Sequence, residues 1–287
     1  MKYSKLLAVI YISIIFLCNS CSPAFRQTNS KPITAILGAF EKEITLLEDQ
    51  LTDQRQRRIE GIRFVSGKLN GRSVVIAWTG VGKVNAAMTT TLLLEHFRPS
   101  EVIFTGIAGG VNPQIQAGDI VIAQKTAQHD LGVMWPDGFI NKGVKNPLDG
   151  WENPVFFPAD EQLLKLARAA AEQVELQTIE TNTGRRKPRI ITGIVVSGDV
   201  FVASPDKCIE LRNKLEADAV EMEGAAVAQI CYQRQIGYIV IRSISDKADE
   251  GAVLDKQIFY LLAAKNSAGL VAEIVRLLGS ELPAVAK

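Results

Sequence analysis

A chain of 287 residues is long enough to bury a large hydrophobic core, most simply as one α/β domain. Hydrophobic residues make up 47% of the chain and charged residues 22%, a balance typical of soluble globular enzymes. The net charge of +1 gives no electrostatic reason to expect nucleic acid or an anionic membrane surface as a partner.

The first predicted element is a signal segment over residues 1–21. Lys2 and Lys5 precede an apolar run, Leu6–Cys18, and small polar residues follow, which is the order of a secretory signal. The apolar run is shorter than the roughly 20 residues that span a membrane. We therefore expect a bacterial protein that is exported, either to the periplasm or to a lipid anchor. "LCNSC" loosely matches a lipobox ending at Cys21, and an uncleaved amino-terminal membrane anchor is the alternative.

Three further regions follow the signal. Residues 22–32 are polar and predict a linker, residues 33–280 a single folded domain, and residues 281–287 a tail. Apolar runs rich in β-formers alternate with helical patterns in the domain, which predicts a largely parallel sheet with helices on both faces. The predicted strands are Ile33–Phe40, Ser73–Trp78, Val102–Phe104, Asp119–Ala123, Gly193–Ser197 and Tyr238–Ile241. The predicted helices are Glu41–Leu51, Lys83–Phe97, Ala159–Leu176, Pro205–Leu215, Gly224–Arg234 and Gln257–Leu278.

One stretch of the domain has no regular pattern. From Met134 to Pro158 the chain is rich in Gly, Pro and Asn and holds two Trp, which predicts an irregular excursion. Such a loop is either functional or a surface insertion.

Metal and disulfide chemistry are not expected. The two histidines, His96 and His129, have no Cys or His at ligand spacing, so we predict no metal and no cofactor. Cys208 and Cys231 lie in apolar helical contexts and are predicted as core thiols.

The segments that follow predicted strands hold the candidate functional residues, because ligands bind at the carboxyl ends of strands in such sheets. "TGVGKVNAA" after the second predicted strand is not a phosphate-binding P-loop, since Ala77 and Val84 stand where that motif needs Gly and Ser or Thr. The candidate segments are Gly38–Glu43, Thr79–Val84, Thr105–Gly110, Ser197–Val202, Glu221–Glu223 and Ser243–Asp246.

Four acids in these segments allow structural as well as functional readings. Glu221 and Glu223, spaced by two on a predicted strand end, would share a face and repel unless something binds there. Glu43 in the first turn of a helix is stabilised by the helix dipole in any case. Asp246, after a buried strand, is either a helix cap or a general acid. Phe201 would ordinarily be assigned to the core.

Six stretches, in order, resemble the methylthioadenosine/S-adenosylhomocysteine nucleosidases of the nucleoside phosphorylase-like family. They are "ILGAFEKEITLL", "TGVGKVNAAMTTTLLLEHF", "TGIAGGVNPQIQAGDIVIA", "VSGDVFVAS", "AVEMEGAAVAQIC" and "VIRSISDKAD". The resemblance implies a three-layer αβα sandwich with a mixed, largely parallel central sheet. It also implies a homodimer that uses water to cleave the bond between adenine and a 5'-thio-substituted ribose.

The resemblance assigns the chemistry to acids. Asp246 matches the general acid that protonates adenine at N7, held by Ser245. Glu43 matches the residue that deprotonates the attacking water, with Arg242 nearby. Glu223 matches the residue that grips the ribose hydroxyls, where a negative charge favours an oxocarbenium-like transition state.

The remaining positions carried over from the resemblance bind the substrate. Met222 would pack against the sugar, Phe201 would stack on adenine, and the backbone of Val202 would read its edge. Phe40 and Val81 match apolar positions near the 5'-thio group and the ribose.

Three departures from the family pattern affect the pocket. Ile107 stands where some relatives carry Ser, which removes a polar contact. Lys247 follows Asp246 where an apolar residue is common, and its charge would oppose protonation of Asp246 unless it points away. The excursion from Met134 to Pro158 could reshape the 5' pocket or the dimer contact.

Three other functions compete with this prediction. Phosphorolysis is disfavoured because Phe104 stands at a phosphate-binding Arg position of the related phosphorylases and Glu43 would repel phosphate. A non-catalytic exported nucleoside-binding protein would lack the acid and the base, and both are present. A nucleosidase for another purine nucleoside, such as futalosine, uses a related site.

Overall fold

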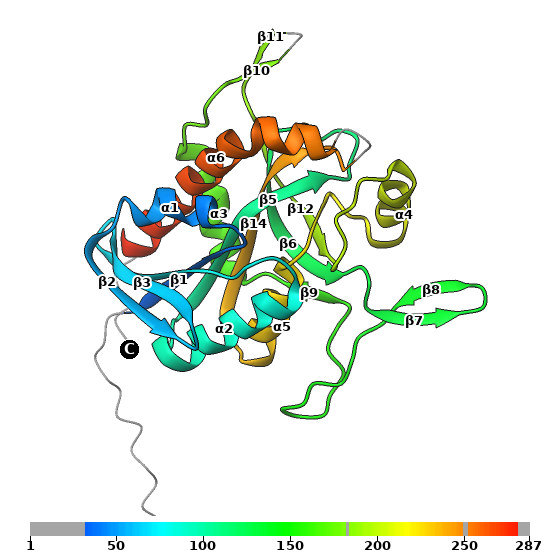
Figure 1. Ribbon diagram of the computed structural model, residues 1–287, viewed down its shortest axis with the longest axis horizontal. Coiled ribbons are helices and arrows are strands. Elements are labelled where there is room, and N and C mark those ends of the chain that lie inside the picture. Colours follow the sequence, from blue (N-terminus) through cyan, green and yellow to red (C-terminus); the bar gives the residue numbers. More distant parts are fainter. Residues whose placement is uncertain (1–31, 182–183, 249–251, 281–287) are drawn as a thin grey trace, which may run out of the picture. The chain divides into compact units, whose positions relative to one another are not determined.

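A computed structural model describes residues 32–181, 184–248 and 252–280 (Figure 1). The predicted signal (1–21), nearly all of the predicted linker (22–32) and the predicted tail (281–287) therefore lie outside the described residues. Within these ranges, no helix is long and apolar enough to cross a membrane.

One mixed sheet organises the domain. In the described residues its strand order is β13-β12-β6-β14-β5-β1-β4-β3-β2, with β9 paired to β6. The pairs β14–β5, β5–β1, β1–β4, β6–β12 and β12–β13 are parallel, whereas β6–β14 and the β2–β3–β4 edge are antiparallel. The bounds are β1 Ile33–Gly38, β2 Thr52–Ile59, β3 Ile62–Leu69, β4 Arg72–Trp78, β5 Glu101–Gly110, β6 Ile120–Gln128, β9 Phe156–Pro158, β12 Ile190–Ser197, β13 Ala219–Glu221 and β14 Gly237–Asp246.

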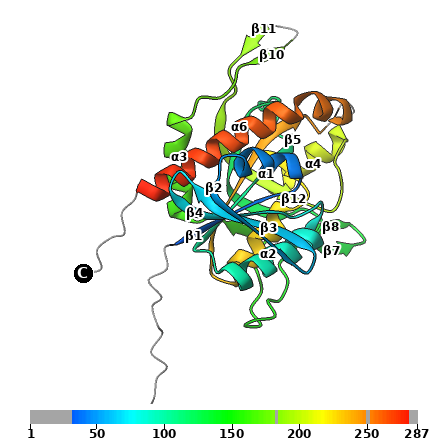
Figure 2. The ribbon, with the colours of Figure 1, turned by 60° about the vertical axis from the view of Figure 1, so that its left-hand side comes forward.

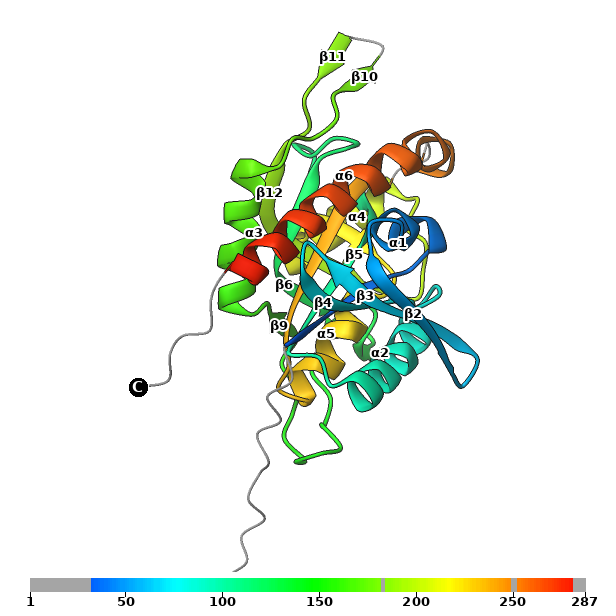
Figure 3. The same ribbon diagram turned by 90° about the vertical axis from the view of Figure 1, so that its left-hand side faces the viewer.

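Helices cover both faces of this sheet, which confirms the predicted three-layer αβα architecture (Figures 2 and 3). On one face lie α1 (Glu41–Glu48), α3 (Glu161–Gln173) and α6 (Ala252–Ser280), and on the other α2 (Lys83–Phe97) and α5 (Gly224–Gln233). Helix α4 (Pro205–Leu215) packs on β12. Successive side chains of β1 point to opposite faces of the sheet. Ile36 belongs to the hydrophobic cluster under α1 and α6, whereas Ala35 and Leu37 belong to the cluster under α2 and α5.

Two predicted strands are much longer than their apolar runs. Strand β5 continues past Phe104 through "TGIAGG", and β14 continues past Ile241 to Asp246. The two strands pair in parallel to the end, where Asp246 lies opposite Gly109 after a bulge. Pairing with β14 thus keeps the glycine-rich end of β5 extended. It also places the carboxyl ends of β5 and β14 side by side.

Several strands were not predicted. Strand β2, "TDQRQRRI", is exposed along all but its last residue as the sheet edge, so it lacks the apolar alternation of a half-buried strand. The predicted irregular excursion begins instead as a hairpin, formed by β7 (Gly132–Trp135) and β8 (Gly138–Asn141). A second hairpin pairs β10 (Ile179–Thr181) with β11 (Gly184–Arg186). Cys208 and Cys231 are buried thiols, as predicted.

Candidate active site

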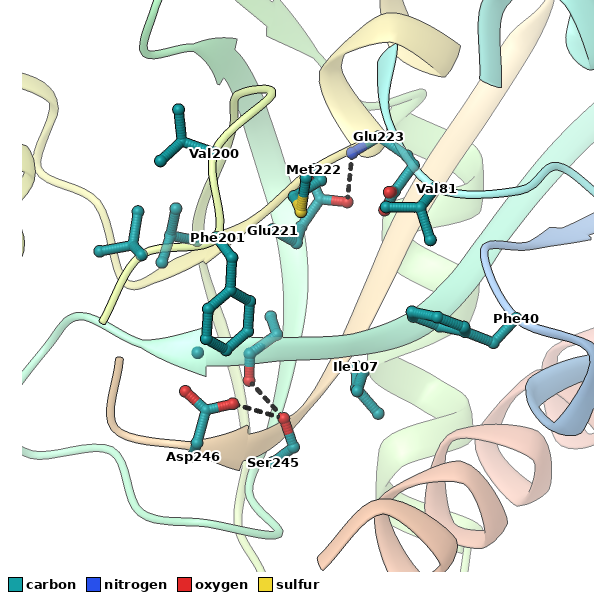
Figure 4. Close-up of a pocket in the computed structure, with 14 residues that line it drawn as sticks. Phe40, Val81, Ile107, Val200, Phe201, Glu221, Met222, Glu223, Ser245 and Asp246 are labelled. Atoms are coloured by element: carbon teal, nitrogen blue, oxygen red, sulfur yellow. Dashed lines mark hydrogen bonds between the residues drawn. The ribbon is translucent and has the colours of Figure 1, made fainter. Parts of the chain in front are cut away.

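A pocket opens at the carboxyl ends of β5, β13 and β14, bounded by the loops after β1, β4 and β12. Its volume, including the part open to solvent, is about 540 Å³. The lining residues are Phe40, Val81, Ile107, Ala108, Gly109, Val200, Phe201, Val202, Val220, Glu221, Met222, Glu223, Ser245 and Asp246 (Figure 4). The candidate segments from the sequence therefore meet at one edge of the sheet.

The pocket has two apolar sides and two polar ends. Phe40 and Val81 lie on one side, and Phe201 lies opposite them (Figure 4). Asp246 stands at one end, beside the Phe201 ring, and Glu223 stands toward the other. Phe201 is 43% exposed, so it is a rim residue of the pocket rather than a core residue. A flat bicyclic base and an attached sugar fit the distribution of apolar surface and acids.

Asp246 is buried and held in one orientation. Its Oδ2 accepts a hydrogen bond from the Ser245 hydroxyl at 2.7 Å, and its Oδ1 accepts one from the Ala248 N–H at 2.8 Å. The side chain of Lys247 is exposed whereas Asp246 is 2% exposed, so the lysine points away, as protonation of Asp246 requires.

Glu223 lies beyond the strand, at the N-cap of α5, because β13 ends at Glu221. The two acids therefore do not share a strand face, contrary to the sequence-based expectation. Oε1 of Glu223 accepts a hydrogen bond of 2.8 Å from the N–H of Gly82, which precedes α2. Burial, followed by the nearby charge of Glu221, raises the pKa of Glu223 to about 8.

Glu221 lines the pocket but is fully engaged by the protein. It pairs with Arg242, whose Nη2 lies 2.6 Å from Oε2, and it accepts a hydrogen bond from the Ser197 hydroxyl. The N–H groups of Glu223 and Gly224 also donate to it, at 2.8–3.1 Å. Glu221 thus anchors the start of α5 and neutralises a buried guanidinium.

Arg242 and Glu43 lie behind the lining rather than on it. Arg242 is 1% exposed, and its guanidinium carbon stands 4.0 Å from the centre of the Phe104 ring. A Cβ at Gly106 would lie 3.0 Å from Glu43 Oε1 and 3.1 Å from Arg242 Nη1, so glycine lets both side chains approach the strand closely.

Glu43 connects to the pocket through two lining residues. Its carboxylate accepts hydrogen bonds from the N–H of Phe40 at 2.9 Å and from the N–H of Ile107 at 3.1 Å. The first of these bonds also caps α1, so Glu43 has a structural role at the start of this helix as well. Burial raises the pKa of Glu43, although Arg242 and the backbone donors oppose this shift.

The structure brings together every site residue predicted from the sequence, with Glu43 and Arg242 one layer deeper than the others. The sequence-based assignment did not include Ala108, Gly109, Val200 and Val220, which line the pocket. Ala108 and Gly109 belong to the "TGIAGG" motif and Val200 to "SGDVFVAS", so a signal for them was present. In the described residues, no three His, Cys, Asp or Glu side chains are grouped to hold a metal ion.

Comparison with known proteins agrees with this geometry. The family model of the phosphorylase superfamily matches residues 33–276. A 5'-methylthioadenosine/S-adenosylhomocysteine nucleosidase from Psychromonas ingrahamii is 38% identical over 84% of this chain and 96% of its own. The same enzyme from Neisseria meningitidis, solved with methylthio-immucillin-A, superposes with a TM-score of 0.73 at 35% identity, covering 85% of this chain and 99% of its own. Futalosine hydrolase from Helicobacter pylori gives a TM-score of 0.72 at 31% identity, covering 85% of this chain and 97% of its own.

Proposed function

The chain belongs to the phosphorylase superfamily, and we propose that it is a nucleosidase that hydrolyses 5'-methylthioadenosine and S-adenosylhomocysteine to adenine and the thio-substituted ribose. The observation that carries this proposal is the placement of three acids. Asp246 is beside the aromatic ring of Phe201, Glu223 is at the opposite end, and Glu43 is behind the wall between them.

Asp246 acts on the leaving group. Adenine departs readily only when N7 is protonated, and a carboxyl group next to a ring that stacks on the base is placed to deliver that proton. Ser245 and the Ala248 N–H hold the carboxyl group in one orientation. Phe201 stacks on the base, and the backbone of Val202 reads its edge.

Glu223 acts on the sugar. With a pKa near 8, its carboxyl group exchanges between donor and acceptor states close to neutral pH, so it can bind the ribose hydroxyls in either state. As the bond to adenine breaks, positive charge grows on the ribose and favours the carboxylate form. Met222 packs against the sugar, and Phe40 and Val81 flank the 5'-thio group.

Glu43 acts on water. Its raised pKa makes it a stronger base than an exposed glutamate, and the N–H donors of Phe40 and Ile107 fix its carboxylate at the pocket wall. Arg242, on the same side of Gly106, limits the repulsion among the acids.

Water rather than phosphate is the acceptor. A phosphate dianion would meet the carboxylates of Glu43 and Glu223 in a desolvated cleft, which is unfavourable without an arginine fork. The nearby guanidinium of Arg242 is already bound to Glu221, and Phe104 occupies the family's phosphate-binding arginine position.

The deciding experiment measures adenine release from methylthioadenosine in phosphate-free buffer. We expect free methylthioribose as the co-product and little change in rate when phosphate is added. A phosphate requirement, or a ribose 1-phosphate as the main product, would contradict the hydrolase assignment while leaving the fold unaffected. Absence of turnover with normal ligand binding would favour a non-catalytic binding protein.

Futalosine is the second substrate to assay. The similarity to futalosine hydrolase is close to that of the nucleosidases, and both kinds of enzyme act on purine nucleosides. We expect kcat/KM for methylthioadenosine to exceed that for futalosine, and the reverse order would change the substrate while retaining the mechanism.

Export and assembly are further parts of the proposal. The charged, apolar and polar order of residues 1–21 supports a signal, with cleavage or lipidation at Cys21 and a periplasmic or membrane-anchored location. Mass spectrometry of the native protein should find a start near Cys21 or Ser22, and an intact Met1 would contradict cleavage. The homodimer is proposed from the resemblance, and sedimentation of the purified protein tests it.

A further inference from the structure

Two separate segments form the rims of the pocket. One is Val81–Lys83, which leads into α2, and the other is Gly198–Val202, which follows β12. The flanks of the second segment are buried, but Val200 is 55% exposed and Phe201 is 43% exposed. Packing therefore covers the tip of this segment only in part, and a polar connection to the opposite rim can add to what sets its position.

A carboxylate joins the two rims directly. Oδ1 of Asp199 accepts a hydrogen bond of 2.7 Å from the N–H of Lys83, the first residue of α2. The N-cap of this helix is Gly82, which has no side chain to satisfy the first N–H groups. Asp199 supplies that cap from the opposite rim, where a negative charge also meets the positive end of the helix.

A third segment completes the connection. Asp130, at the end of β6, accepts a hydrogen bond from the Lys83 ammonium at 2.6 Å and another from the Asp199 N–H at 2.9 Å. Burial alone would raise the pKa of Asp130, but the bonds from Lys83 and Asp199 hold it below its usual range. Lys83, Asp130 and Asp199 thus form a closed ring of hydrogen bonds, which we call the rim clasp.

The rim clasp acts on both ends of the substrate site. On one side, the neighbouring N–H of Gly82 binds Glu223, the proposed ribose ligand. On the other, Asp199 lies two residues before Phe201, the proposed stacking partner of adenine. Asp199 is not among the residues that line the pocket.

We propose that the rim clasp preorganises the pocket, and that Asp199 is a positioning residue for nucleoside binding. This inference rests on the proposed nucleosidase function. When the clasp is broken, the tip with Phe201 samples open positions, and binding must restore the closed one. The apparent dissociation constant then rises, because it equals the dissociation constant of the closed form divided by the fraction of molecules that are closed. Once substrate is bound, stacking holds the tip in place, so kcat changes little.

The test compares three variants by steady-state kinetics with methylthioadenosine. Asp199→Ala should raise KM about tenfold, if the stability typical of a helix cap is lost from the closed rim, and leave kcat within about threefold. Asp199→Asn keeps an oxygen acceptor for the Lys83 N–H and should recover most of the affinity. Asp206→Ala is the matched control, because it removes an exposed acid from the first turn of the nearby helix α4.

Hydrogen exchange tests the clasp without any substrate. The amide of Lys83 should exchange at least about tenfold faster in Asp199→Ala than in Asp206→Ala, since its acceptor is gone. Should Asp199→Ala fail to fold, Lys83→Met serves instead, because it breaks the ammonium bond to Asp130 and should also raise KM.

The possible results separate the two proposals. A KM for Asp199→Ala equal to that of Asp206→Ala would overturn the positioning role, as would a fall in kcat at unchanged KM. Unchanged exchange at Lys83 would show that the clasp does not hold the rims. A wild-type protein that releases no adenine would remove the nucleosidase function, whereas the exchange result would still decide the clasp.

Discussion

The two glutamates of the pocket lining, Glu221 and Glu223, have opposite surroundings. Glu221 is paired with Arg242, which lies behind the lining, and receives further hydrogen bonds from Ser197 and from backbone N–H groups. Glu223, two residues away, accepts a bond from Gly82 and has a pKa of about 8. Although the two acids are almost equally buried, Glu221 is thus a structural anchor and Glu223 is a candidate ligand for the sugar.

The difference shows how a stable fold can contain a reactive site. A buried carboxylate without full compensation costs stability and shifts its pKa toward neutrality, which is the range where proton transfer and hydroxyl binding are useful. The bonds of Glu221 to Arg242 and to the Gly224 N–H connect β13 to β14 and to the start of α5. They hold these elements in place around Glu223, whose charge has fewer partners.

The largest expected effect concerns Asp246. Asp246→Asn keeps the shape but has a single acceptor oxygen, so it can accept only one of the hydrogen bonds from Ser245 and Ala248, and it cannot deliver a proton to N7. We expect kcat to fall at least about 100-fold, the scale of a positioned general acid, with melting temperature nearly unchanged. Adenine release measured beside Asp206→Asn tests this, and near-normal turnover by the folded variant would remove Asp246 from the chemistry.

Glu43→Gln should separate chemistry from binding. The amide has one acceptor oxygen, so it retains only one of the hydrogen bonds from Phe40 and Ile107. Because an amide is also a poor base, we expect kcat to fall by about 100-fold or somewhat less. The dissociation constant of a non-hydrolysable analogue, measured by calorimetry, should change by less than about threefold. Normal hydrolysis would place the base elsewhere, with Glu221 as the next residue to substitute.

Glu221→Gln should act mainly on stability. It removes the ion-pair partner of the buried guanidinium of Arg242, and breaking a buried pair typically costs about 3–5 kcal/mol. We expect the melting temperature to fall by about 10 °C, and calorimetric unfolding measures it. If Glu223→Gln lowered the melting temperature equally at pH 7, the contrast between Glu221 and Glu223 would be wrong.

Glu223→Gln should act mainly on the pH dependence of stability. Because the pKa of Glu223 is about 8 in the folded protein against 4.5 as reference, the folded state binds the extra proton between these values. Its contribution to stability is complete below 4.5 and is lost as pH rises through 8. The melting temperature of the variant minus that of the wild type should therefore increase by about 10 °C from pH 5 to pH 9. A flat difference would indicate an unshifted carboxyl group.

Local pattern was sufficient for much of the fold. The helices Lys83–Phe97 and Pro205–Leu215 begin and end as predicted, and the second carries its own start signals, the Ser204 cap and Pro205. Strands β5 and β14 were predicted too short, since their second halves are held by pairing with each other. The edge strand β2 was missed because exposure leaves no alternation to detect.

The sequence by itself determined the α/β class, the order of most elements and the identity of the acids at the strand ends, because residue type and spacing are properties of short segments. Only the tertiary structure decided which acid is paired and which has a shifted pKa. Arg242 from β14 meets Glu221 from β13, and Gly82 before α2 meets Glu223, across contacts between distant segments. The pKa of a carboxyl group depends on its burial and partners, and both arise only when those segments pack together.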